Sequence, residues 1–79
     1  MAHFALINDD NVVQEVIVIS NDDVDNVPFP QSESIGQQYI ASIGLTGTWL
    51  QTSYNANYRG IYAGIGDIYD PESDTFTNG

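Results

Sequence analysis

The first twenty residues alternate between apolar runs and a turn in a way that predicts a β-hairpin. An apolar run at 3–7 and a β-branched run at 12–19 flank residues 8–11, which are Asn and Asp turn formers. Residues 14–15 are polar and indicate an exposed or bulged stretch. Residues 16–19 are apolar on both faces, so this strand is expected to be central in its sheet or to meet a partner with one face.

A helical spacing of apolar residues follows a polar loop. The members of this stripe recur at short helical intervals and are Ile35, Tyr39, Ile40 and Ile43. They predict one helix over about residues 33–43, with Ile35, Tyr39 and Ile43 facing a sheet. Ser32 or Ser34 is the candidate N-cap, and Gly44 stands where a left-handed C-cap is expected. Gly36 is expected to weaken the helix by about 1 kcal/mol relative to Ala.

The second half of the chain predicts three further strands. Residues 48–53 form the first of them, and residues 55–57 follow as a loop. Residues 61–69 are interrupted by glycine but resemble a strand. Residues 70–74 are rich in turn formers, and residues 75–77 return as a final short strand.

These elements together predict an α+β fold, a small antiparallel sheet in the order β-β-α-β-β-β with one helix packed on one face. The length predicts a single domain over residues 1–79. A core of this size seldom supplies more than about 3–5 kcal/mol. The sequence has no cysteine and one histidine, so disulfides and thiolate or histidine zinc sites cannot add support. Oligomerisation or docking on a larger assembly is the remaining source of added stability.

The charge balance excludes several classes of partner. Eleven acidic residues face one Arg and no Lys, for a formal net charge of −10. Nucleic acids and anionic lipids would repel such a chain, because binding them needs Lys and Arg. No apolar run approaches the roughly 20 residues of a membrane span, and the start lacks the basic region of a signal peptide. Strong acidity suits a salty medium, where charge repulsion is screened.

The acidic segment 21–26 resembles a calcium loop only in part. Asn21, Asp23 and Asp25 match the first three alternate ligand positions. Position six requires Gly and is Asn26, while position twelve requires Glu and is Ser32. We therefore expect a solvated turn and no metal site.

Candidate catalytic groups are few. The glycines at 60, 64 and 66 do not match a phosphate-binding loop, because the chain has no Lys. His3 lies near the N-terminus in a predicted strand. The carboxylates lie in turn-rich segments with nothing to bury them and raise a pKa for general acid chemistry. We expect no enzyme activity and no cofactor.

The strongest functional signal is the segment 49–69, which contains the only Trp, four of the five Tyr and the only cation. Rigid amphipathic aromatics with Asn and Arg are typical of contact surfaces. The candidate partner interface comprises Tyr54, Asn55, Asn57, Tyr58, Arg59 and Tyr62. Trp49 is expected in the core. Arg59 is expected to pair with a carboxylate, either on a partner or inside the chain at Asp67 or Asp70.

Five segments of this sequence resemble a family of small virion proteins of cyanophages and other marine tailed phages. They are residues 1–8, 12–22, 49–55, 59–66 and 69–70. The combination of Trp-Leu-Gln-Thr-Ser-Tyr-Asn with Arg-Gly-Ile-Tyr-Ala-Gly-Ile-Gly is the most specific part. Many family members continue into a Trp- and Pro-containing extension that does not occur here.

The resemblance implies a virion structural protein, made in the host cytoplasm and assembled on the phage particle. The leading hypothesis is a capsid decoration or cement protein docking on the outside of the major capsid protein lattice. The alternative is a tail- or fibre-associated module with a receptor or glycan contact. A homo-oligomer is expected, with a trimer favoured, because capsids offer three-fold sites and the core is small.

Overall fold

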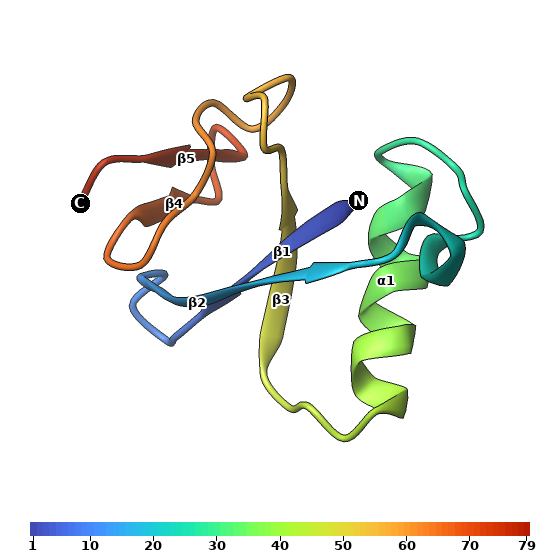
Figure 1. Cartoon of the computed structure of the whole chain (residues 1–79). Coiled ribbons are helices and arrows are strands. Elements are labelled where there is room, and N and C mark those ends of the chain that lie inside the picture. Colours follow the sequence, from blue (N-terminus) through green and yellow to red (C-terminus); the bar gives the residue numbers. More distant parts are fainter.

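The computed structural model describes residues 1–79 and places an α-helix and a short 3-10 helix among five strands (Figure 1). The elements are β1 (Ala2–Ile7), β2 (Val13–Ile19), the 3-10 helix η1 (Asn21–Val24), α1 (Gln31–Ser42), β3 (Thr48–Thr52), β4 (Ile68–Asp70) and β5 (Thr75–Thr77). The predicted α+β class and the order β-β-α-β-β-β are confirmed. α1 is neither long nor apolar enough to cross a membrane.

The strands form two antiparallel sheets instead of one. The first has the order β2-β1-β3, and the second is the β4-β5 hairpin. The strand expected over residues 61–69 is reduced to β4, because Gly66 adopts a left-handed φ of 92° that ends regular pairing. β2 pairs with β1 alone, so the prediction of a central position for this strand is wrong.

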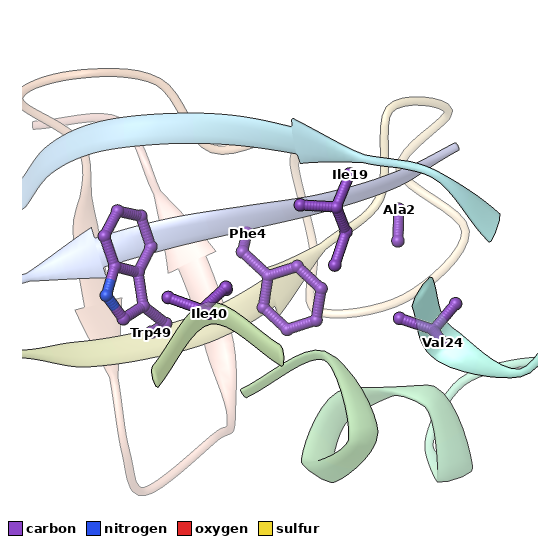
Figure 2. Packing of buried hydrophobic residues seen from close by; sticks show 6 residues of the cluster. All are labelled: Ala2, Phe4, Ile19, Val24, Ile40 and Trp49. Carbon is purple, nitrogen blue, oxygen red and sulfur yellow. The ribbon is translucent and has the colours of Figure 1, made fainter. Parts of the chain in front are cut away.

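The three-stranded sheet has a hydrophobic core on each face. Toward α1, six residues pack together, namely Ala2, Phe4, Ile19, Val24, Ile40 and Trp49 (Figure 2). On the opposite face the cluster consists of Ala5, Ile7, Val13, Ala63 and Phe76. Alternate residues of β1 point into the two clusters, as the period of two in a strand requires. Trp49 is buried, as the sequence predicted.

The helix begins and packs differently from the prediction. Its N-cap is Pro30, which has no side-chain cap, and the Ser32 hydroxyl instead donates to Gln51 Oε1 at 2.7 Å inside the protein. Ile40 is fully buried, whereas Ile43 is 53% exposed. The expectation that Ile43 faces the sheet is wrong, because α1 ends at Ser42 and Ile43 is its C-cap.

Two glycines in and after the helix have identifiable roles. Gly44 adopts a φ of 91°, the left-handed conformation that the sequence predicted beyond the helix. Gly36 is buried against the ring of Phe4, where a Cβ atom would overlap the ring. Gly36 lowers the helix propensity of α1, but the absence of a side chain there allows α1 to pack closely on the sheet.

Candidate functional site

Arg59 lies at the junction of the helix, the sheet and the C-terminal hairpin. Its guanidinium pairs with Glu33 of α1, donates to Gln51 O of β3 at 3.0 Å and pairs through Nε with Asp74 Oδ1 at 2.9 Å. The side chain is only 9% exposed, and its guanidinium carbon lies 5.0 Å from the centre of the Phe29 ring.

This position explains the electrostatics of Arg59. Burial alone would lower the pKa of Arg59, but the hydrogen bonds and charges of Glu33 and Asp74 outweigh burial and raise it. The expected intrachain partners, Asp67 and Asp70, were wrong. Asp67 accepts from Gly64 N at 2.8 Å, and Asp70 accepts from its own turn.

Side chains also occupy the outer edge of β3. Gln37 Nε2 donates to Trp49 O at 2.6 Å, and Gln51 N donates to Glu33 Oε2 at 2.9 Å. Together with the bond from Arg59 to Gln51 O, these contacts occupy backbone groups that an edge strand would otherwise present to another chain. This edge of the sheet is therefore closed.

Three rings gather on the face of the sheet opposite α1. His3 of β1 stacks on Tyr54 with ring centres 5.5 Å apart, and Tyr62 meets both rings edge-on at 5.5 Å and 5.2 Å. Tyr54 is 65% exposed and Tyr62 38% exposed. We call His3, Tyr54 and Tyr62 the aromatic surface. Its rings hold one another in place while leaving much of their area open to a partner.

A groove of about 530 Å³ adjoins the aromatic surface. Its lining consists of Met1, His3, Thr52, Ser53, Tyr54, Asn55, Asn57 and Tyr58. The lining combines three rings with amide and hydroxyl groups, and it contains no carboxylate. Two hydrogen bonds join residues of the lining: Ser53 Oγ accepts from Asn57 N at 3.0 Å, and Thr52 O accepts from the Tyr58 hydroxyl at 3.3 Å. The loop that forms the groove is therefore ordered by its own hydrogen bonds.

The aromatic surface is uncharged in a chain of net charge −10. Burial lowers the pKa of His3 from its ordinary value, with a smaller contribution from the N-terminal ammonium. The imidazole is therefore neutral at neutral pH. Since charged groups are costly to desolvate and neutral aromatics are not, this is the part of the molecule best suited to burial against a partner.

The structure separates the six predicted interface residues into two groups. Tyr54, Asn55, Asn57 and Tyr58 line the groove, and Tyr62 belongs to the adjoining aromatic surface. Arg59 is instead enclosed by the protein. Tyr58 is partly enclosed as well, because it stacks on Phe29 at 3.9 Å and its hydroxyl donates to Thr52 O at 3.3 Å. Burial raises the pKa of Tyr58 and outweighs the opposing effect of the Arg59 charge.

Sequence reasoning missed His3 and Met1 as parts of this site. Both precede the aromatic segment by about fifty positions, and the antiparallel pairing of His3 with Thr52 brings them beside it. The register of β1 against β3 was the missing information, because the sequence predicted the two strands without their alignment. The apolar start of the chain was the only available signal.

The acidic segment that resembled a calcium loop forms η1. Ser20 Oγ accepts from Asp22 N at 3.3 Å, and Asn26 Nδ2 donates to Asp22 Oδ1 at 3.0 Å. No group of three or more His, Cys, Asp or Glu side chains is arranged to hold a metal ion.

Comparisons with protein-family models, with characterised proteins and with solved structures give no match. Function is therefore inferred from the geometry of the surface together with the sequence resemblance.

Proposed function

We propose that this chain is a structural, non-enzymatic component of a tailed-phage particle and docks on that particle through the aromatic surface and its groove. One observation carries the proposal. In a chain with eleven acidic residues, the exposed rings of Tyr54 and Tyr62 and the groove beside them form a region without a carboxylate. Exposed Tyr side chains held in place by neighbouring rings are typical of interface hot spots.

The finer proposal is a capsid decoration protein that binds the outer face of the major capsid protein lattice. Its support is the small single domain, the acidic remainder suited to face salty water, and the resemblance to small virion proteins. A trimer at three-fold sites of the capsid is part of this proposal. Light scattering in seawater-like and low-salt buffers tests it, with association expected to rise with salt because screening weakens repulsion between acidic copies.

Copy number on purified particles tests the role directly. Quantitative mass spectrometry is expected to find hundreds of copies per particle for a capsid protein. Tens of copies or fewer would indicate the tail, and absence from purified particles would contradict a virion role altogether. Cryo-electron microscopy of the same particles then locates the chain.

Substitution tests whether the aromatic surface makes the contact. Tyr54→Ala is expected to lower occupancy on particles while leaving the unfolding midpoint nearly unchanged, because this side chain is 65% exposed. Leu45→Ala is the matched control, since Leu45 is a 41% exposed apolar residue that lies beyond the end of α1. Equal occupancy of both variants and the unaltered protein would remove the aromatic surface from the interface.

The groove favours a second candidate, a tail- or fibre-associated module that contacts a glycan or receptor. Amide and hydroxyl groups beside an exposed ring can bind sugar hydroxyls and the apolar face of a sugar ring. Titration with soluble oligosaccharides from a susceptible host, monitored by tyrosine fluorescence, tests this candidate. Saturable binding that Asn57→Ala abolishes, with a tail-like copy number, would favour it over capsid decoration.

A further inference from the structure

β2 has the composition of a central strand but lies at an edge of its sheet. Val16, Ile17 and Val18 are consecutive β-branched residues, and Val18 is 48% exposed. The strand has no Pro, Gly or Lys, the residues that commonly protect an edge from pairing with other chains.

The outer edge of β2 is open along most of its length. At its start, Val13 N donates to Asp67 O at 2.8 Å, and Val13 O accepts from Gly66 N at 2.9 Å. From Gln14 to Ile19, the backbone makes no hydrogen bond outside the ladder with β1. The opposite edge, β3, is occupied by Gln37, Glu33 and Arg59 as described above. The protein therefore closes one edge of the sheet with side chains and leaves the other available.

The charges around β2 decide which kind of chain fits this edge. Carboxylates lie before the strand at Asp9 and Asp10, within it at Glu15, and after it in η1 at Asp22 and Asp23. Both ends are acidic, so a second copy of β2 would bring like charges together in either orientation. A strand with an apolar centre and basic ends would instead place opposite charges side by side.

We propose that β2 is a docking edge for an extended segment of a partner protein, with β-branched residues at its centre and Lys or Arg at both ends. The segment adds a fourth strand beside β2, and main-chain hydrogen bonds from residues 14–19 supply the contact. Val18 pairs with His3 across the ladder, so the added strand borders the aromatic surface. This inference rests on the proposed docking role, and it adds a second contact, at β2, whose partner is a basic, β-branched strand.

A synthetic peptide tests the proposal on the full chain. The probe is Lys-Lys-Val-Thr-Val-Thr-Val-Lys-Lys, and amide hydrogen exchange by NMR is the measurement. Exchange is expected to slow at least about tenfold at outward-facing amides of residues 14–19, as new ladder hydrogen bonds form. Binding is expected to weaken with salt. A peptide with Glu in place of each Lys keeps the apolar centre, and a version N-methylated at its five central residues keeps the charge but lacks the donors. Neither is expected to protect β2.

Variants on the two edges complete the test. Val18→Lys is expected to weaken binding about fivefold, roughly the value of one cross-strand pair. Thr48→Lys adds the same charge at an exposed position of β3 and is expected to match the unaltered protein after correction for net charge. Protection confined to other segments, equal binding of the acidic or N-methylated peptide, or a dimer with protected β2 amides in the absence of peptide would each overturn the proposal. Failure here with reduced occupancy of Tyr54→Ala would leave the proposed function intact.

Discussion

Replacing Arg59 is the perturbation that most directly tests how this fold is stabilised. The residue adopts a φ of 57°, which is unfavourable for a side chain other than Gly, Asn or Asp. The contacts of its guanidinium with Glu33, Gln51 and Asp74 must outweigh that strain. Arg59→Met keeps the length and the apolar stem of the side chain but removes all of these contacts.

The magnitude follows from the burial of the pair. The side chains of Arg59 and Glu33 are 9% and 19% exposed, so removing one partner leaves a largely buried charge without compensation. Such a loss costs about 3–5 kcal/mol, which is comparable to the whole stability expected of a domain this small. Arg59→Met is therefore expected to be mostly unfolded at 25 °C in dilute buffer. Replacing both members by Met removes the unpaired charge, and the double variant is expected to regain at least about 1 kcal/mol.

Urea unfolding followed by the fluorescence of buried Trp49 measures these free energies. Added sulfate stabilises the folded state, so that even the least stable variant shows a measurable folded baseline and can be compared with the others. The series comprises the unaltered protein, Arg59→Met, Glu33→Met and the double variant, with Leu45→Ala as the surface control. A loss below about 1 kcal/mol for Arg59→Met, or strict additivity in the double variant, would refute the structural role assigned to this pair.

Three further predictions follow from the packing and from one perturbed group. Ile40→Ala should lower the free energy of unfolding by about 2–5 kcal/mol, and Ile43→Ala, at an exposed position, by less than about 1 kcal/mol. The same urea assay measures both losses, and equal losses would contradict the observed buried face of the helix. Gly36→Ala should destabilise the protein by about 1–2 kcal/mol, because overlap of the new methyl with the Phe4 ring costs more than the better helix propensity of Ala contributes. A more stable variant would mean that α1 shifts freely on the sheet. Burial and the hydrogen bond to Asp74 raise the pKa of Tyr69 to about 12, so the folded state retains its proton longer than the unfolded state, and stability should fall as pH rises from about 10 to 12. Tyr69→Phe should flatten that part of an alkaline unfolding curve, and an unchanged slope would contradict the assignment.

Periodicity was sufficient to predict the elements of this fold but not their packing. The runs at 3–7 and 12–19 became β1 and β2, and the terminal strand at 75–77 has the predicted bounds. The helical stripe was correct except at its end, where Ile43 falls beyond the last helical turn. Gly44 correctly marks the end of α1, but periodicity alone extends the buried stripe to Ile43, which is the C-cap and is exposed. Periodicity also cannot reveal that Gly36 faces a ring, because that contact depends on the approach of α1 to β1.

The candidate site was predictable only where it is local in sequence. The aromatic segment was found from composition, and Tyr54 and Tyr62 are exposed as a contact surface requires. His3 was not, because its place beside these rings depends on strand register. The partners of Arg59 were also beyond prediction: eleven carboxylates were available, and only the tertiary fold brings Glu33 and Asp74 to it.

Arg59 is the only Lys or Arg in the chain, and its burial limits how the protein can bind a partner. With Arg59 enclosed by Glu33 and Asp74, the surface offers carboxylates and neutral groups but no Lys or Arg to a partner. The proposed contacts through the aromatic surface would then depend on apolar and hydrogen-bonding groups, and those proposed along β2 on basic residues of the other chain. The two modes differ in their response to salt, since screening weakens charge pairing but leaves apolar burial largely intact. In a salty medium the aromatic surface would hold the protein in place, and β2 would select which neighbouring strand it accepts.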